Sequence, residues 1–249
     1  MYLSYTRLNF KIDIMRKIFL LCSLTFFLHT TAQTSVFDTL LKDHVDSNGN
    51  VNYKDFKADE AQLQTYLHEL AATKPQESWS AAKTKAFWVN AYNAYTIKLI
   101  LDNYPLKSIM NIKKKGKDAW NIPFAKVGGK TYTLNQIEHE ILRKKYNDPK
   151  IHVAVNCASK SCPKLANYAF TENNYETKTG VLMQNFVNDP SRNKISENKV
   201  QLSKIFEWFN GDFTKKGDLI DFLNQYSNVK INKKAKIGYL EYNWSLNGR

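Results

Sequence analysis

Residues 151–163 bring together more chemically versatile side chains than any other stretch of the chain. They include a histidine, two cysteines, an asparagine, a lysine and a serine: His152, Cys157, Cys162, Asn156, Lys160 and Ser161. A cysteine thiolate is a strong nucleophile, and a nearby base or positive charge favours its formation. One hypothesis is therefore an enzyme of hydrolase or transferase type in which Cys157 or Cys162 is the nucleophile or redox centre.

The same two cysteines allow a structural interpretation. Four residues separate Cys157 from Cys162, and in an oxidising compartment such a pair can form a disulfide across a turn. The closed loop is short, so the bond would add only about 2 to 3 kcal/mol to stability. Under this alternative the protein is a non-catalytic ligand- or protein-binding module with a structural disulfide.

A β-strand is predicted at residues 151–156, because the run is rich in β-branched residues and is bounded by turn-forming sequences. Side chains alternate along a strand, so His152 and Cys157 would face opposite ways. A straight strand would also separate their Cα atoms by roughly 16 Å. This geometry argues that another element supplies a base to the cysteine.

His139 is the candidate for that base. It lies in a helix predicted at residues 134–145, with Glu138 beside it and Arg143 one turn later. The catalytic candidates are therefore Cys157, Cys162, His152 and His139. The candidate binding residues near them are Glu138, Arg143, Asn156, Lys160 and Ser161.

Two amides in a largely apolar helix are the remaining candidates for a site. Asn90 and Asn93 lie one turn apart on the helix predicted at residues 80–103. A buried amide needs hydrogen-bond partners, which can be adjacent loops or a ligand. In the binding-module alternative, Asn90, Asn93 and His152 form the floor of a pocket.

Neither a metal site nor a cofactor is predicted. The histidines after the N-terminal region are His44, His68, His139 and His152. Together with a single pair of cysteines, they show no spacing typical of a zinc site.

The N-terminal region is predicted to be a secretory signal. An apolar run at residues 18–28 follows Arg16-Lys17 and precedes small, uncharged residues. At 1.5 Å per residue the run covers only about 16 Å, which is too short to span a bilayer. We expect translation to start at Met15 and residues 1–32 to be removed after Ala32. The mature protein is then periplasmic or extracellular, with no membrane span.

Charge and composition limit the partners. The chain has a formal net charge of +13, and 43% of its residues are hydrophobic, enough for a substantial core. An exported protein rarely meets nucleic acid, so an anionic polymer of the cell envelope or a small molecule is the expected partner. The lysines are scattered, and a solvated surface explains them as well.

The pattern of elements indicates an α+β fold. Residues 33–249 contain no repeat and no Pro/Gly/Ser-rich linker, which predicts a single domain. A long central helix is expected to pack with the others on a small, mainly antiparallel sheet. Helices are predicted at 37–44, 60–72, 80–103, 134–145, 175–187, 204–210 and 219–226, and strands at 127–132 (a hairpin), 151–156, 199–202 and 236–242.

Several motifs resemble the domain-of-unknown-function family 547 of exported bacterial proteins and plant proteins. The resemblance covers roughly residues 37–247 and implies a shared fold, but it brings no settled activity. The motifs are Phe87-Trp88-Val89-Asn90-Ala91-Tyr92-Asn93-Ala94, Ile137-Glu138-His139-Glu140-Ile141-Leu142-Arg143, Asp148-Pro149-Lys150-Ile151-His152, Asn156-Cys157, Ser161-Cys162-Pro163, Leu202-Ser203-Lys204-Ile205-Phe206 and Tyr242-Asn243-Trp244-Ser245-Leu246-Asn247.

Two positions depart from the family pattern. Lys150 stands where the family usually has arginine, and Asn243 where it usually has aspartate. If that aspartate carries charge in catalysis, this member is weakened or inactive. The order of a helix with Trp88 and Asn90 before an element with His152 is also similar to papain-like and transglutaminase-like enzymes, although this helix has no cysteine.

Overall fold

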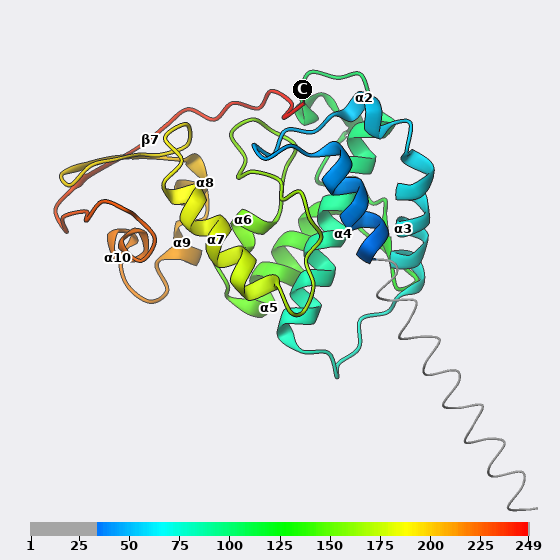
Figure 1. Cartoon of the computed structure of the whole chain (residues 1–249), viewed down its shortest axis with the longest axis horizontal. Helices are drawn as coiled ribbons and strands as arrows, with labels where there is room; N and C mark the ends of the chain where they lie inside the picture. Colours follow the sequence, from blue (N-terminus) through cyan, green and yellow to red (C-terminus); the bar gives the residue numbers. More distant parts are fainter. Residues whose placement is uncertain (1–33, 249) are drawn as a thin grey trace, which may run out of the picture.

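The computed structural model describes residues 34–248, and the predicted signal region lies outside them. Helices dominate, and the strands form three small sheets, which confirms the α+β class (Figure 1). Residues 34–44 are helical. The other helices are α2 (Tyr53–Phe56), α3 (Glu60–Ala72), α4 (Ala81–Asp102), a 3-10 turn (Ile109–Asn111), a π-helix (Gln136–Arg143), α5 (Lys144–Tyr146), α6 (Ile151–Ala154), α7 (Tyr175–Val187), α8 (Lys204–Trp208), α9 (Asn210–Phe213) and α10 (Leu219–Asn224).

Helix α4 is the long central helix that the sequence predicts. Ser80 caps its start, because its Oγ accepts a hydrogen bond from the Lys83 N–H at 3.1 Å. The helix ends three residues before Pro105, as expected when proline cannot continue a helix. Most of its residues are buried, so it forms an axis around which the other helices pack.

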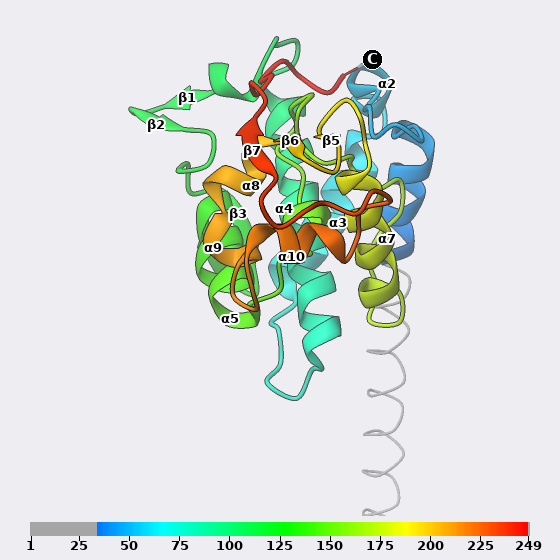
Figure 2. The same ribbon diagram turned by 90° about the vertical axis from the view of Figure 1, so that its left-hand side faces the viewer.

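The sheets are small and lie apart from one another. Two are antiparallel hairpins, β1 (Lys113–Lys114) with β2 (Lys117–Asp118) and β3 (Ala125–Val127) with β4 (Lys130–Tyr132). The third contains β5 (Lys194–Ile195), β6 (Lys199–Leu202) and β7 (Lys236–Tyr239), with β6 and β7 parallel. This sheet lies at the end of the molecule opposite α3 and faces the viewer in Figure 2.

The turn between β3 and β4 follows directly from two glycines. Gly128 and Gly129 have φ angles of 55° and 78°, a conformation in which most L-residues are strained. Two positive φ values in succession are typical of the tight turns that join hairpin strands. The predicted hairpin is therefore confirmed.

A capping box opens the next helix. The Thr133 Oγ1 accepts a hydrogen bond from the Gln136 N–H, and the Gln136 side chain accepts one from the Thr133 N–H, both at 3.0 Å. The helix that follows is wound as a π-helix over Gln136–Arg143. Such windings are rare and are frequently found at functional sites.

The strand predicted at residues 151–156 is wrong. Residues Ile151–Ala154 form α6, a single helical turn in which the Val155 N–H donates to the Ile151 carbonyl at 3.1 Å. Ile151 packs in a hydrophobic cluster around α4, whereas Val153 packs in a second cluster around α7, α8 and α10. A helical turn buried on all sides has the same continuous apolar sequence as a buried strand.

The C-terminal segment runs beside the turn that carries the cysteines. Ser159 and Leu246 form an isolated antiparallel bridge, and the Lys160 N–H donates to the Ser245 carbonyl at 2.8 Å. These contacts hold residues 242–248 against residues 157–162. Within residues 34–248, the helices are too short or too polar to cross a lipid bilayer.

Candidate functional site

A cavity of about 190 Å³ collects the four predicted catalytic candidates. Cys157 and Cys162 line it from the turn after α6, His152 from α6 itself, and His139 from the π-helix. Because α6 is helical, His152 and Cys157 do not lie on opposite faces of a straight strand, as the sequence predicted. Both histidines and both cysteines therefore face the same small space.

The two sulfur atoms lie 2.9 Å apart. A disulfide bond is about 2.05 Å long, so both cysteines are free thiols in this structure, and the predicted disulfide is not formed. The Cys157 N–H also donates a hydrogen bond to the Cys162 Sγ at 3.0 Å. Cys157 is partly exposed, whereas Cys162 is buried.

Two hydroxyl groups complete the surroundings of Cys157. Its Sγ lies 3.2 Å from the Ser159 Oγ and 3.2 Å from the Tyr242 hydroxyl, and these two oxygens are 3.0 Å apart. The Ser159 hydroxyl donates to the Tyr242 oxygen, which leaves the Tyr242 hydrogen free to be donated to a thiolate at Cys157. The C-terminal segment thus brings Tyr242 to a sulfur 85 residues away in sequence.

Because of this hydrogen-bond network and the burial of the site, the two thiols have different pKa values. Burial by itself raises the pKa of Cys157, but the hydrogen bonds from the Cys162 thiol and the two hydroxyls outweigh burial and lower it below its ordinary value. Burial and the adjacent Cys157 thiolate raise the pKa of Cys162 well above its ordinary value. The first proton therefore leaves from Cys157, and Cys162 keeps its own.

His152 is held by an aspartate. Its Nε2 lies 2.8 Å from the Asp212 Oδ2, and the Arg143 Nε donates to the same oxygen at 2.6 Å. Burial opposes the charge of Asp212, but the hydrogen bonds from His152 and Arg143 outweigh it and hold the pKa of Asp212 well below its ordinary value. An ionised carboxylate only accepts, so the His152 Nε2 carries a proton and its Nδ1 remains to exchange one.

His139 has a different hydrogen-bond partner, so a different ring nitrogen carries its hydrogen. Its Nδ1 lies 3.0 Å from the Arg143 Nη1, and an arginine can only donate, so Nδ1 is the acceptor. Neutral His139 therefore carries its hydrogen on Nε2. It is suited to donating a hydrogen bond to a ligand, whereas His152 is suited to accepting and returning a proton.

Aromatic rings form much of the remaining wall. Trp208 and Trp244 lie nearly parallel with their centroids 5.8 Å apart, and Tyr242 packs against both. Phe209 stacks on the His152 ring at 4.3 Å. The aromatic residues that line the cavity are Tyr92, Trp120, Trp208, Phe209, Tyr242 and Trp244. These surfaces reduce the access of water to the thiol and histidine.

Three of the predicted binding amides act as clamps on the backbone. Asn90 bonds to both the N–H and the carbonyl of Phe170, at 2.9 and 2.8 Å. Asn93 accepts from the Asn156 N–H and donates to the Ala154 carbonyl, both at 2.9 Å, and therefore fixes the end of α6. Asn156 in turn accepts from the Ala158 N–H at 2.8 Å. Asn90, Asn93 and Asn156 do not line the cavity.

The other predicted binding residues divide between the wall and the surface. Glu138 lines the cavity and is buried. Lys160 is exposed, and the Ser161 Oγ accepts a hydrogen bond from the Asn243 N–H at 2.8 Å. Neither lies in the cavity wall. Arg143 acts on the site indirectly, through Asp212 and His139.

The family departure at Asn243 lies outside the cavity wall. Its side-chain oxygen accepts a hydrogen bond from the Ser245 N–H at 2.9 Å, a bond that an aspartate could also form. The side chain is exposed. The departure at Lys150 is also remote from the thiols, because Lys150 pairs with Glu176.

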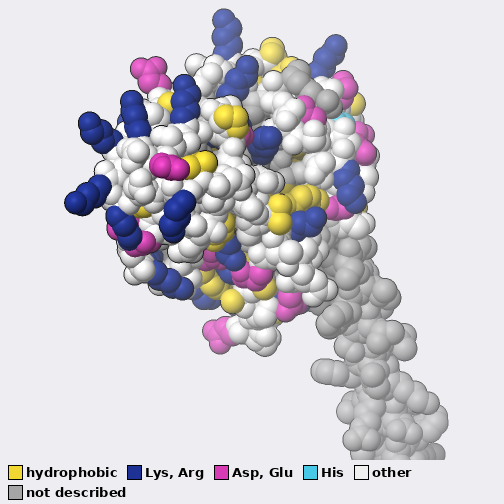
Figure 3. Space-filling view, turned by 60° about the vertical axis from the view of Figure 1, so that its left-hand side comes forward, with side chains coloured by type: hydrophobic (Ala, Val, Ile, Leu, Met, Phe, Trp, Pro, Cys, Tyr) yellow, Lys and Arg dark blue, Asp and Glu magenta, His cyan; other side chains and the backbone are white. Residues whose placement is uncertain are grey.

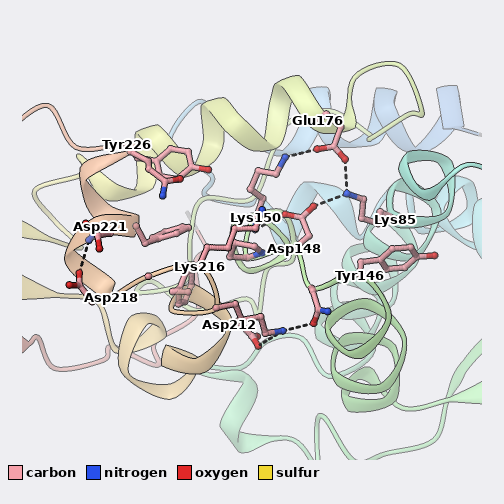
Figure 4. A pocket seen from close by; sticks show the side chains of 17 residues that line it. Lys85, Tyr146, Asp148, Lys150, Glu176, Asp212, Lys216, Asp218, Asp221 and Tyr226 are labelled. Atoms are coloured by element: carbon pink, nitrogen blue, oxygen red, sulfur yellow. Dashed lines mark hydrogen bonds and ion pairs between the residues drawn. The ribbon is translucent and has the colours of Figure 1, made fainter.

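A second cavity, of about 400 Å³, also contains Asp212 in its wall (Figure 4). Lys85 lies there between two carboxylates, 2.7 Å from Asp148 and 2.6 Å from Glu176, and its side chain is only 8% exposed. Dashed lines in Figure 4 join lysines of this cavity to the carboxylates or amides with which they pair. Asp212 lines this second cavity and also bonds to His152, which lines the first.

Sequence reasoning missed Asp212 and Tyr242. Asp212 lies in Asn210-Gly211-Asp212, which reads as a turn and gives no sign of a histidine partner. Tyr242 belongs to the C-terminal motif that resembles the family, and the motif was the one available signal. In residues 34–248 no group of three His, Cys, Asp or Glu side chains is arranged to hold a metal ion.

The basic side chains are spread over the surface. On the face drawn in Figure 3, lysine and arginine side chains stand apart from one another, with acidic groups among them. The basic side chains are more numerous on the upper and left-hand parts of this face than on its right-hand part.

Comparison with family models agrees with the sequence motifs. Residues 76–187 match the family described as "Protein of unknown function, DUF547", which confirms the family resemblance. The matched segment contains α4, the π-helix and both cysteines, and it ends before Asp212 and Tyr242. Comparisons with curated proteins and with solved structures found no match.

Proposed function

We propose that the protein is a thiol- and histidine-dependent enzyme of hydrolase or transferase type, with Cys157 as the nucleophile. The observation that carries the proposal is the free, partly exposed Cys157 thiol in a cavity that His152 also lines. Hydrogen bonds lower the pKa of this thiol, and thiolate is the reactive form. The His152 and Asp212 pair supplies the acid and base that such chemistry needs.

The chemistry follows from the two protonation sites. The Cys157 thiolate attacks the carbonyl carbon of an acyl substrate, and the leaving group departs with a proton from protonated His152. The His152 Nδ1 then accepts a proton from water or another acceptor, which attacks the thioester and releases the Cys157 thiolate. Asp212 stabilises the imidazolium that is present before the first step and forms again in the second, and it keeps the Nε2 proton in place. His139 is positioned to donate a hydrogen bond to the substrate.

An activated acetyl ester tests this proposal directly. Reduced protein is mixed with p-nitrophenyl acetate, and the site and rate of acetylation are measured by peptide mass spectrometry and nitrophenol release. We expect a transient acetyl group on Cys157, with turnover that His152→Gln slows about a hundredfold. Absence of any acetylated cysteine in folded protein would remove the proposal.

His44 offers a matched control. It is also a buried histidine paired with an aspartate, with its Nε2 2.9 Å from the Asp59 Oδ2, but it lies outside the cavity. His44→Gln should therefore turn over the ester like the unmodified protein. Equal effects of His44→Gln and His152→Gln would indicate a loss of stability and not a loss of catalysis.

A non-catalytic binding module is the second candidate, and the aromatic wall favours it. Six aromatic side chains around one cavity are typical of ligand-binding pockets. In this case ligand binding quenches tryptophan fluorescence, and Cys157→Ala retains binding. If Cys157→Ala loses ester turnover and no ligand is found, the result favours the thiol enzyme over the binding module.

Export remains part of the proposal. A short apolar run after Arg16-Lys17 supports removal of residues 1–32 and a periplasmic or extracellular location. An anionic envelope polymer or a small molecule is the proposed partner. N-terminal sequencing of the exported protein should begin at Gln33, and an uncleaved N-terminus would contradict the signal.

A further inference from the structure

The turn from Cys157 to Cys162 is built to hold two thiols in contact. Ala158 has a φ of 55°, a left-handed conformation that non-glycine residues rarely adopt. Hydrogen bonds keep it there: the Ala158 N–H donates to the Asn156 Oδ1 at 2.8 Å, and the Asn247 N–H donates to the Ala158 carbonyl at 3.2 Å. A strained residue maintained in this way is typical of a functional site.

Arg192 fixes the other end of the same turn. Its Nε donates to the Cys162 carbonyl at 2.9 Å, and its Nη2 donates to the Lys160 carbonyl at 3.1 Å. An ion pair with Asp189 at 2.8 Å holds the guanidinium. The backbone on both sides of the thiols is therefore anchored from a distant part of the chain.

The two thiols differ in the way that a two-step exchange requires. Cys157 is partly exposed, so a disulfide from solution can reach it, whereas Cys162 is buried behind it. The Cys157 N–H donates to the Cys162 Sγ at 3.0 Å, and this bond stabilises negative charge on the second sulfur. In acyl transfer only Cys157 forms a bond to the substrate, and Cys162 serves only as its hydrogen-bond partner.

From this geometry we propose that the protein also carries out thiol–disulfide exchange with low-molecular-weight disulfides, with Cys157 as the attacking thiol and Cys162 as the resolving thiol. The Cys157 thiolate attacks one sulfur of the disulfide, forms a mixed disulfide and expels one thiolate. Cys162 then gives its proton to the expelled thiolate and attacks the Cys157 sulfur. An internal disulfide forms and the second thiolate leaves.

The distance between the sulfurs supports the second step. They move closer by roughly 0.9 Å, from 2.9 Å to the length of a disulfide bond. The disulfide form has no free nucleophile, so the same reaction reversibly stops the proposed acyl transfer. The exchange itself does not depend on that transfer.

Glutathione disulfide is the probe. Reduced wild-type protein is mixed with an excess, quenched with acid and examined by intact mass and peptide mapping. We expect a brief glutathione adduct on Cys157, then loss of two hydrogens from the protein mass and release of two glutathione molecules. Cys162→Ser should stop at the adduct, and Cys157→Ser should react at least about tenfold more slowly than Cys162→Ser.

Two results would overturn the exchange. One is a wild-type adduct that persists without resolving, and the other is equal reaction of Cys157→Ser and Cys162→Ser. If a variant does not fold, the time course of the glutathione adduct in wild-type protein shows whether the exchange occurs. Acetylation without an internal disulfide would overturn this inference alone, whereas an internal disulfide without acetylation would overturn the proposed acyl transfer alone.

Discussion

The imidazole of His152 and the carboxylate of Asp212 are 2.8 Å apart although sixty positions separate them in the chain. Helix α6 carries the histidine, α9 carries the aspartate, and Arg143 from the π-helix bonds to the same carboxylate oxygen. Three elements thus meet at one charged group beside the thiol cavity. The stability of this junction should depend on pH.

Replacing Asp212 with asparagine should destabilise the fold in a pH-dependent way. The pKa of Asp212 is lowered in the folded protein, so its stabilising effect is complete above the ordinary value of 3.8 and is lost as the pH falls below it. We expect Asp212→Asn to cost about 2 kcal/mol at pH 7. Urea unfolding should show the difference shrinking below pH 4; a constant difference down to pH 2 would contradict the assigned charge.

The Tyr242 hydroxyl should make Cys157 more reactive. Tyr242→Phe removes one donor to the thiolate, which raises the pKa of Cys157 and leaves less thiolate at neutral pH. Labelling by iodoacetamide at pH 7 should become about tenfold slower. Tyr239→Phe, in the neighbouring strand but outside the cavity, is the matched control and should label at the wild-type rate.

Iodoacetamide should also distinguish the two cysteines. The pKa of Cys157 is lowered and that of Cys162 is raised well above its ordinary value, so alkylation between pH 6 and pH 8 should fall on Cys157. Cys162 should remain unmodified until the protein is unfolded. Peptide mapping measures this directly, and preferential labelling of Cys162 would reverse the assignment of nucleophile and resolving thiol.

Asn93 should be among the most important polar residues for stability. Its side chain makes two buried hydrogen bonds to the backbone at the end of α6, and Asn93→Ala leaves both backbone groups without partners. The free energy of unfolding should fall by about 2 to 4 kcal/mol. Asn173→Ala, at an exposed position, is the control and should change it little. Similar small effects of both changes would show that Asn93 does not clamp the turn.

Replacing Asn243 with aspartate, the residue usual in the family, should leave the reactivity of Cys157 unchanged. The exposed side chain accepts from the Ser245 N–H, and an aspartate can accept the same bond. Asn243→Asp should therefore leave the rate of Cys157 labelling within about twofold of wild type. A large gain in ester turnover would instead mean that a carboxylate here takes part in the chemistry.

The local elements could be derived from the sequence because their signals lie within a few residues. Ser80 and Pro105 mark the limits of α4, Gly128 and Gly129 make the turn of the hairpin, and α3, α7 and β6 have the bounds that their periodicity predicts. Each depends on backbone geometry that neighbouring residues set by themselves.

Residues 151–156 show where such reasoning failed. Their apolar sequence is compatible with a buried strand or a buried helical turn, and the outcome depends on two hydrophobic clusters that assemble from distant segments. With the helical turn, His152 lies in the wall of the thiol cavity, which the strand excluded.

The sequence by itself therefore determined the α+β class, the bounds of α3, α7 and β6, and the cysteines and histidines able to do chemistry. Only the tertiary structure decided which of them meet. Asp212 reaches His152, and Tyr242 reaches Cys157, across 60 and 85 positions. Such pairings depend on the packing of the whole core, because no local signal in a sequence encodes the partner of a side chain.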